Sequence, residues 1–212
     1  MFNIDKYIEI KEYIKKLGKS AEIVAISKNH SLESVETAIH MGVKVFGENR
    51  VQEAKSKFEK ILIKKPETEL HLTGPLQTNK VKHALKIFDV FHTLDREKLL
   101  KEFSKYQELI EKKIFFVQVN TGKELSKSGV FPENVKKFIG LCDLHGVKNI
   151  QGLMCIPPIN EDPKKHFKLI SDISIDLGFS GLSIGMSTDY KEALEFNPSH
   201  IRLGTVLFGK RK

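Results

Sequence analysis

A lysine at the end of an apolar run is the residue whose setting most strongly suggests chemistry. Lys28 follows the apolar residues 23–26 and Ser27, so its amine would extend from the end of a buried strand rather than from a charged helix. Partial burial disfavours the ammonium form and supplies the neutral amine that condenses with a carbonyl group to form a Schiff base. The same position also suits a lysine whose stem covers apolar surface while its ammonium reaches water.

Two later segments carry groups that bind phosphate in proteins. Residues 185–189 read Gly-Met-Ser-Thr-Asp and precede a short helical pattern, and residues 202–205 read Arg-Leu-Gly-Thr. Each segment alone also has a structural explanation, because a serine can cap a helix and a glycine can serve close packing. Taken together they indicate a phosphate site, at which glycine would let the backbone approach the ligand. The residues of these two segments that we expect to contact the phosphate-bearing ligand are Met186, Ser187, Arg202, Gly204 and Thr205.

The elements that must position these residues follow a repeating pattern. Eight short runs rich in β-branched or aromatic residues recur, and each is followed by an amphipathic stretch, which is typical of a parallel sheet flanked by helices. A length of 212 residues suits a compact (β/α)8 barrel. We predict one domain over residues 1–212, a (β/α)8 TIM-type barrel with an extra N-terminal helix at 5–17. The expected strands are 22–27, 43–47, 69–74, 90–94, 114–120, 150–156, 181–186 and 200–207.

An open doubly wound sheet is the alternative to the barrel, although the dinucleotide fingerprint Gly-x-Gly-x-x-Gly is absent. In a barrel the last strand pairs with the first, so Lys28 would lie a few strand spacings of about 4.8 Å from both phosphate segments. Asn49, after the second predicted strand, and Arg202 can face a heteroaromatic ring. These residues therefore suit pyridoxal 5′-phosphate better than a sugar phosphate.

Composition excludes several other classes of protein. The formal charge is +8, but four arginines among 35 basic residues and lysines interspersed with glutamates indicate a solvated surface rather than nucleic-acid binding. No apolar run approaches the roughly 20 residues of a membrane span, and the N-terminal residues lack the order of a secretory signal, so we expect a cytoplasmic protein. The two cysteines, Cys142 and Cys155, lack metal-ligand spacing, and we expect buried thiols and no metal site.

From about residue 21 to residue 209 the chain resembles the pyridoxal phosphate homeostasis proteins. The resemblance is specific because many blocks occur in the same order. The blocks are Ala-Ile-Ser-Lys at 25–28, Phe-Gly-Glu-Asn-Arg-Val-Gln-Glu at 46–53, His-Leu-Thr-Gly-Pro-Leu-Gln-Thr-Asn-Lys at 71–80, Val-Asn-Thr-Gly-Lys at 119–123, Ser-Lys-Ser-Gly at 126–129, Gly-Leu-Met at 152–154, Leu-Ser-Ile-Gly-Met-Ser at 182–187 and Ile-Arg-Leu-Gly-Thr at 201–205.

The resemblance implies a barrel like the N-terminal domain of bacterial alanine racemase, with the cofactor held as an internal aldimine on Lys28. It implies phosphate contacts from Ser187, Gly204 and Thr205, and a contact from Arg202 to the pyridine nitrogen. Because a guanidinium keeps its protons, that nitrogen would stay unprotonated and the ring would be a poor electron sink. We also expect no counterpart of the racemase's second domain, whose tyrosine is the opposing acid–base group.

We therefore expect a monomer that stores pyridoxal 5′-phosphate, supplies it to apoenzymes as part of vitamin B6 homeostasis, and has no catalytic residue or turnover of its own. Two enzymatic alternatives stay open: an amino-acid racemase or lyase of low activity that uses the cofactor, and an aldolase-like barrel that uses Lys28 on a sugar phosphate. Tyr190 suits an ordinary helix position better than an acid–base role, and Glu48 is expected to orient its neighbours. The matching blocks contain three further residues to which we assign no role, His71, Lys80 and Lys127.

Overall fold

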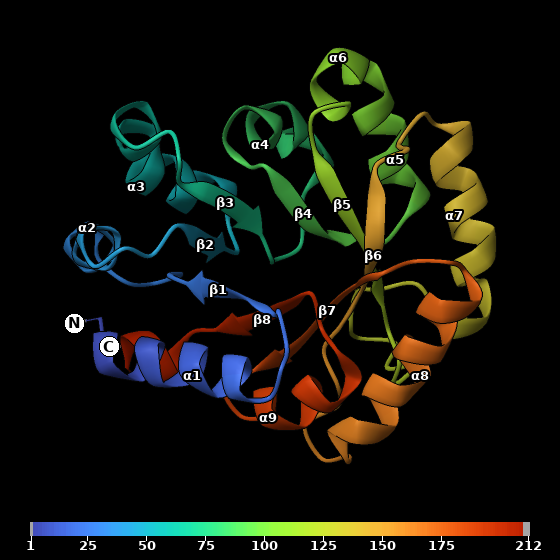
Figure 1. The fold of residues 1–212 in the computed structure, drawn as a ribbon. Helices are drawn as coiled ribbons and strands as arrows, with labels where there is room; N and C mark the ends of the chain where they lie inside the picture. Colours follow the sequence, from blue (N-terminus) through green and yellow to red (C-terminus); the bar gives the residue numbers. More distant parts are fainter. Residues whose placement is uncertain (1, 210–212) are drawn as a thin grey trace.

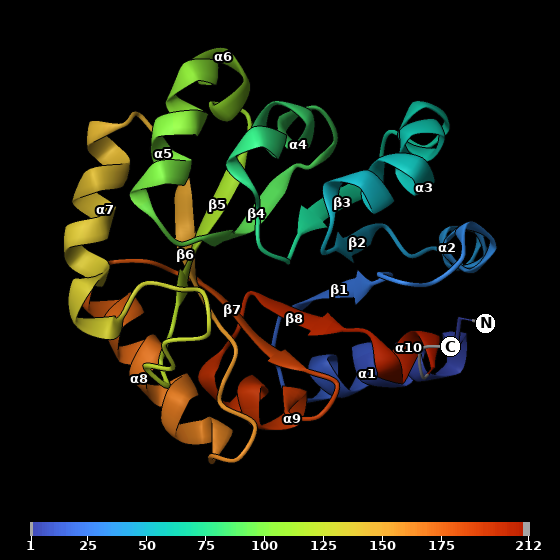
Figure 2. The same cartoon turned by 180° about the vertical axis from the view of Figure 1, so that it is seen from behind.

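The computed structural model describes residues 2–209, in which eight parallel strands close into a barrel (Figures 1 and 2). Each strand pairs with the next along the chain, and the last pairs with the first. The strands are β1 (Glu22–Ile26), β2 (Val45–Glu48), β3 (Glu69–Leu72), β4 (Val90–Leu94), β5 (Ile114–Val119), β6 (Ile150–Cys155), β7 (Gly181–Met186) and β8 (His200–Leu203).

Helices surround the outside of this barrel (Figure 1). None of those within residues 2–209 is both long enough and apolar enough to span a membrane. The α-helices are α1 (Ile4–Lys16), α2 (Leu32–His40), α3 (Val51–Lys64), α4 (Val81–Ile87), α5 (Glu97–Phe103), α6 (Gln107–Ile110), α7 (Val135–Leu144), α8 (Pro163–Asp176), α9 (Tyr190–Ala193) and α10 (Thr205–Phe208). The 3₁₀ turns are η1 (Thr78–Lys80), η2 (Ser104–Tyr106), η3 (Pro132–Asn134) and η4 (Leu194–Phe196).

The predicted TIM-type barrel with its N-terminal helix is confirmed, and the open sheet is wrong because β8 pairs with β1. Helix α1 lies on the side of the barrel, next to α10, so that the two ends of the described chain meet (Figures 1 and 2). The Asn3 N–H donates to the Leu207 carbonyl oxygen at 2.7 Å, and the rings of Phe2 and Phe208 pack edge to face. The N-terminal helix thus closes the ring of helices beside the last strand.

The predicted eighth strand, 200–207, is too long. Strand β8 ends at Leu203, and residues Thr205–Phe208 form α10, whose Leu207 and Phe208 N–H groups donate to the Gly204 carbonyl oxygen at 2.9 Å. An apolar run can bury its side chains as a strand or as a helix, and here contact with α1 favours the helix. Gly204 and Thr205 consequently lie beyond β8, at the rim of the barrel. The other predicted strands agree with the structure within two residues.

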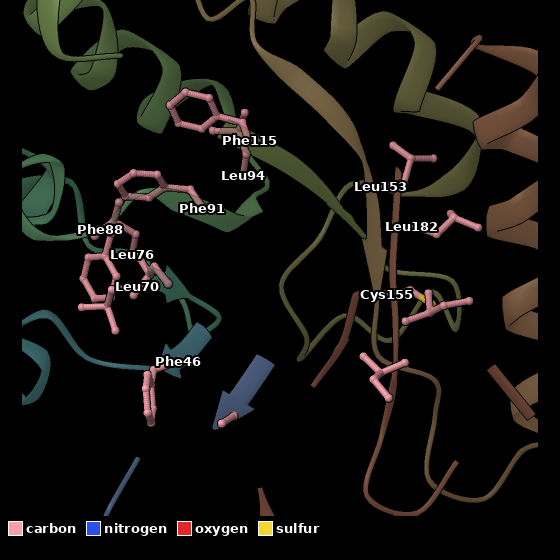
Figure 3. Packing of buried hydrophobic residues seen from close by; sticks show 14 of the residues in the cluster. Phe46, Leu70, Leu76, Phe88, Phe91, Leu94, Phe115, Leu153, Cys155 and Leu182 are labelled. Atoms are coloured by element: carbon pink, nitrogen blue, oxygen red, sulfur yellow. The ribbon is translucent and has the colours of Figure 1, made fainter. Parts of the chain in front are cut away.

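The main hydrophobic core lies between the strands and the surrounding helices (Figure 3). Successive side chains on a strand point to opposite faces, so Phe46, Leu70, Phe91 and Phe115 point outward to the helices and are almost fully buried. Burying each such side chain contributes about 1.5–3 kcal/mol. The residues that alternate with these point into the barrel, and several of them are polar.

Candidate functional site

A cavity of about 240 Å³ lies at the carboxyl ends of the strands, where ligands bind in barrels of this kind. Its walls come from segments far apart in the sequence, because closure of the barrel brings the exits of β1, β2, β7 and β8 together. The seven residues predicted to contact a ligand all line it: Lys28, Asn49, Met186, Ser187, Arg202, Gly204 and Thr205. Four lining residues were not predicted: Ile26, Thr73, Ile156 and Thr188.

Lys28 lies two residues after β1, on a tight turn. The His30 N–H donates to the Ser27 carbonyl oxygen at 3.1 Å, and Asn29 has a left-handed backbone with a φ of 61°. Asparagine tolerates this conformation better than most residues because its short side chain can hydrogen-bond locally. Ser27 is fully buried and Lys28 is half-buried, so the turn ends the apolar strand with the lysine side chain at the cavity wall.

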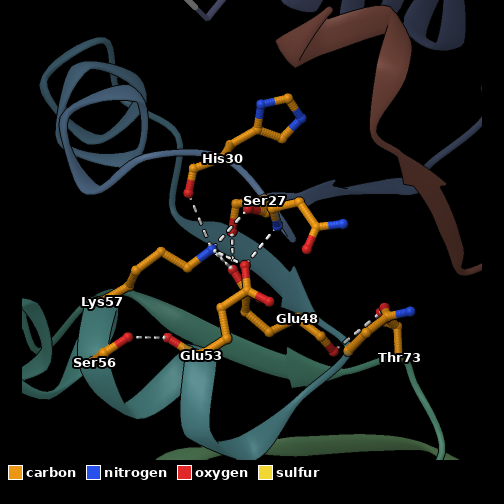
Figure 4. A network of polar contacts seen from close by, with 9 residues as sticks. Ser27, His30, Glu48, Glu53, Ser56, Lys57 and Thr73 are labelled. Atoms are coloured by element: carbon orange, nitrogen blue, oxygen red, sulfur yellow. Dashed lines mark hydrogen bonds and ion pairs between the residues drawn. The ribbon is translucent and has the colours of Figure 1, made fainter. Parts of the chain in front are cut away.

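The buried ammonium group of Lys57 binds the turn at residues 27–30 (Figure 4). Lys57 Nζ, on α3, donates to the carbonyl oxygens of Ser27 at 2.8 Å and His30 at 3.4 Å. It also pairs with Glu48 Oε1 at 2.6 Å and Glu53 Oε1 at 2.8 Å. One cation therefore joins β2 and α3 to both ends of the segment that carries Lys28.

The two carboxylates of this cluster stabilise the same turn. Glu48 Oε1 accepts the Ser27 hydroxyl at 2.7 Å, and Glu53 Oε1 accepts the Asn29 N–H at 2.5 Å. Burial raises the pKa of Glu48 more than Lys57 lowers it. At Glu53 burial acts in the same direction, but the bonds from Lys57 and Asn29 outweigh it and lower the pKa. Glu48 does not line the cavity and instead contacts Ser27 and Lys57.

Hydroxyl and backbone groups of the loops after β7 and β8 form another part of the cavity wall. Ser187 Oγ accepts the N–H groups of Gly204 and Val206, each at 3.3 Å, and so links the loop after β7 to the loop after β8. Asp189 Oδ1 accepts the Met186 N–H at 2.5 Å and closes the first loop. The hydroxyls of Ser187 and Thr205 can donate to an anion in the cavity, whereas the N–H groups of Gly204, Val206 and Met186 donate to other protein atoms.

Arg202 lines the cavity from inside the barrel and is only 4% exposed. Its Nη1 donates to the carbonyl oxygen and to Oγ of Ser183, both at 2.6 Å, and its Nη2 donates to the Cys155 carbonyl oxygen at 2.8 Å. Burial lowers the pKa of the guanidinium. Within residues 2–209 no carboxylate forms an ion pair with it, so backbone and hydroxyl oxygens hold this cation.

Asn49 and Thr73 complete the wall near β2 and β3. The Thr73 hydroxyl donates to Asn49 Oδ1 at 3.0 Å, which orients the Asn49 amide at the cavity. A Cβ on Gly74 would lie 2.5 Å from the Asn49 backbone oxygen, so glycine is required there for the two loops to meet. The position of Thr73 near the carboxyl end of the predicted strand 69–74 was the signal that could have identified it, and in the structure Thr73 directly follows β3.

The remaining residues singled out from the sequence lie elsewhere. His71 is buried inside the barrel, and Tyr190 packs in the hydrophobic core rather than at the cavity. Lys80 and Lys127 line a neighbouring hollow of about 940 Å³. Both cysteines are buried, and burial raises their pKa to about 12, which makes them inert thiols. The described part of the chain contains no cluster of three or more metal-ligating residues.

Comparison with known proteins shows the family of the chain. The family model described as alanine racemase, N-terminal domain, matches residues 8–212. The pyridoxal phosphate homeostasis protein of Aquifex aeolicus (strain VF5) is 37% identical over 204 residues, which cover 91% of this chain and 88% of the relative. The protein of the same name from Buchnera aphidicola subsp. Schizaphis graminum is 32% identical, with coverage of 94% and 92%.

Solved structures match over nearly the whole length. PipY of Synechococcus elongatus PCC7942, solved with PLP bound, is 28% identical with a TM-score of 0.84, and the match covers 97% of this chain and 99% of PipY. PipY without PLP gives a TM-score of 0.87. Alanine racemase of Clostridium difficile 630, at 14% identity and a TM-score of 0.72 over 99% of this chain and 58% of the racemase, shares the fold.

Proposed function

Because the chain belongs to the pyridoxal phosphate homeostasis protein family, we propose that it binds pyridoxal 5′-phosphate at the cavity and holds it covalently through Lys28. One observation carries the proposal: a single small cavity combines a lysine amine, a guanidinium and the hydroxyls of Ser187, Thr188 and Thr205. The cofactor, when bound, supplies an aldehyde that condenses with an amine with loss of water. That chemistry requires the amine and the anion-binding groups to lie within one ligand's length.

Each part of the cavity wall suits one part of the ligand. Ser187 and Thr205 offer hydroxyl donors to a phosphate and Gly204 lets the backbone come close to it, whereas Asn49 and Arg202 border the space left for the ring. Arg202 binds as a donor only, since a guanidinium keeps its protons at neutral pH. Lys28 provides the nucleophilic amine.

The lining of the cavity also supports storage rather than turnover. Proton transfer at a substrate carbon requires positioned acids and bases on both sides of the reacting atom. Among the described residues that line the cavity there is no carboxylate, imidazole, thiol or phenol to act as a second acid–base group beside Lys28. We propose that the protein holds the cofactor reversibly and passes it to apoenzymes.

Absorption spectroscopy tests the proposal. The purified protein, titrated with pyridoxal 5′-phosphate, should gain a visible band from the covalent link, and Lys28→Ala should lose it. Lys127→Ala is the matched control, because Lys127 lies at the same end of the barrel but outside this cavity, and it should keep the band. A panel of amino acids then tests for turnover. Sustained racemisation or cleavage that disappears in Lys28→Ala would overturn the storage function.

A further inference from the structure

A continuous chain of hydrogen bonds runs through the barrel from its amino-terminal end to the cavity. It begins at Glu69, the first residue of β3, whose Oε1 lies 2.5 Å from His71 Nε2. His71 Nδ1 lies 2.8 Å from His92 Nε2, and His92 Nδ1 lies 2.8 Å from Ser183 Oγ. Ser183 Oγ accepts Arg202 Nη1 at 2.6 Å. The three middle residues are fully buried, whereas the Glu69 side chain is 47% exposed.

One assignment of protons gives every link a donor and an acceptor. The bond from His71 lowers the pKa of Glu69, so this carboxylate accepts and His71 Nε2 carries the hydrogen. His71 Nδ1 then accepts from His92 Nε2. Burial lowers the pKa of His92 well below its ordinary value, so this ring is neutral and its Nδ1 accepts the Ser183 hydroxyl. All four bonds therefore point from the cation Arg202 to the anion Glu69.

The surroundings favour this single direction. His200 lies beside both rings, with centroids 5.4 Å from His71 and 5.6 Å from His92, and burial lowers its pKa to about 3. Phe116 stacks on His92 at 4.8 Å and closes the other side. The charged groups facing the chain are Glu69 and Arg202 at its two ends and the Asp189 carboxylate, which attracts Arg202. Hydrogen bonds aligned in this way polarise and strengthen one another.

A chain of this kind is unusual inside a TIM-type barrel, where branched apolar side chains normally fill the space. Buried polar groups lower stability unless they are fully paired, so their presence here calls for a role beyond packing. The bonds of Arg202 to Ser183 and Cys155 use three of its five N–H donors and fix the plane of the guanidinium at the cavity wall. The orientation of the remaining donors follows from that plane.

We infer that Glu69, His71, His92 and Ser183 are positioning residues that fix Arg202 as a hydrogen-bond donor to the ring nitrogen of the ligand. This inference rests on the proposed function, which supplies a ligand with such an acceptor atom. The exposed carboxylate sets the direction of the chain, and the two rings transmit that direction to Ser183. A change at the far end of the barrel therefore alters a contact in the cavity.

The ligand-free protein provides the first test, by nitrogen-15 NMR of the histidine rings. His71 and His92 should both carry their hydrogen on Nε2. Glu69→Ala should shift the ring signals of His92, which it does not touch. Glu22→Ala is the matched control, since Glu22 is an exposed first residue of β1 at the same end of the barrel, and it should leave them unchanged. Unshifted His92 signals in Glu69→Ala would overturn the inference.

The second test compares two probes, pyridoxal 5′-phosphate and its analogue with C–H in place of the ring nitrogen. A charge-assisted hydrogen bond to that nitrogen should make the wild type bind the natural ligand about tenfold more tightly than the analogue. Glu69→Ala and His92→Phe should each reduce this ratio at least about threefold, whereas Glu22→Ala should not. Glu69→Ala keeps the test valid if the buried His92 variant does not fold.

The outcomes separate this inference from the proposed function. If the wild type binds neither probe, the proposed function is wrong, and the inference fails with it. If the wild type binds both equally, or if Glu69→Ala keeps the full ratio, the ligand is bound but the positioning role is wrong. A reduced ratio in Glu69→Ala, together with shifted His92 signals, supports the positioning role.

Discussion

Removing the ammonium of Lys57 tests whether the buried cluster holds the turn that carries Lys28. Lys57→Met keeps the length of the side chain but leaves Glu48, which is fully buried, without its cation. Breaking a buried ion pair by deleting one partner lowers the free energy of unfolding by about 3–5 kcal/mol. We expect the free energy of unfolding to fall by about 3 kcal/mol near neutral pH, the low end of this range. The Glu48 carboxyl can take up a proton when Lys57 is removed, because burial already raises its pKa, and this limits the loss.

The same variant should weaken retention of pyridoxal 5′-phosphate. Residues 27–30 lose two contacts from their carbonyl oxygens to Lys57, so this turn is less ordered before the ligand binds. Ordering one residue on binding costs about 1–2 kcal/mol, which corresponds to roughly a tenfold loss of affinity. Urea unfolding and absorption titration measure the two effects. Because burial raises the pKa of Glu48 above its ordinary value and a protonated Glu48 needs no cation, the loss of stability should shrink as the pH falls from neutral through that raised pKa.

Lys55→Met is the control for this prediction. Lys55 lies on the same helix, more than half exposed, with Glu59 3.8 Å away, so its removal should change stability by less than about 0.5 kcal/mol. Combining Glu48→Gln with Lys57→Met should recover part of the loss, because no buried charge is then left unpaired. The reasoning is refuted if Lys57→Met unfolds no more easily than Lys55→Met.

Three further outcomes are expected. Burial lowers the pKa of His92 and His200 in the folded state, so below about pH 6.5 the unfolded chain binds more protons than the folded chain. The free energy of unfolding should therefore fall on acidification by about 1.4 kcal/mol per pH unit for each histidine. Urea unfolding that does not depend on pH in this range would contradict this. Gly152→Ala would place a Cβ 1.8 Å from the Gly181 backbone oxygen and should lower the free energy of unfolding by roughly 3 kcal/mol. In the control Gly140→Ala, on α7, the new Cβ meets nothing within 4 Å, so the free energy of unfolding should rise by about 0.5–1 kcal/mol. Equal unfolding midpoints for the two variants would disprove the close approach of β6 and β7. Ser187→Ala removes a hydroxyl from the cavity wall and should weaken the affinity for pyridoxal 5′-phosphate about tenfold, as measured by equilibrium dialysis. An unchanged affinity would contradict the role of this hydroxyl.

The positions of the residues that line the cavity could be predicted because they depend on local pattern and on closure of the barrel. Each apolar run ends at a recognisable residue, and a closed parallel barrel brings all such ends to one rim. Lys28 and Ser187 thus come together although 159 residues separate them in the sequence. The boundary of β8 was less accessible, since residues 205–208 are compatible with strand or helix until α1 packs against them.

The supporting residues depend on contacts that no local pattern contains. Lys57 reads as an ordinary lysine of an amphipathic helix, and its burial follows from the meeting of α3, β2 and the turn after β1. His71 and His92 occupy inward positions of neighbouring strands, which alternation alone indicates once the barrel is known. Their direct hydrogen bond depends on the register of β3 and β4, which sequence spacing does not specify.

Reduction with borohydride followed by peptide mass mapping tests the central claim most directly. Reduction makes the link between an amine and the bound aldehyde permanent, so the modified residue can be located in the sequence. We predict one pyridoxyl phosphate per chain, on the peptide that contains Lys28, and no modification at that site in Lys28→Ala. A wild-type adduct found mainly on another lysine, or spread over many, would contradict the assignment of Lys28 as the covalent site.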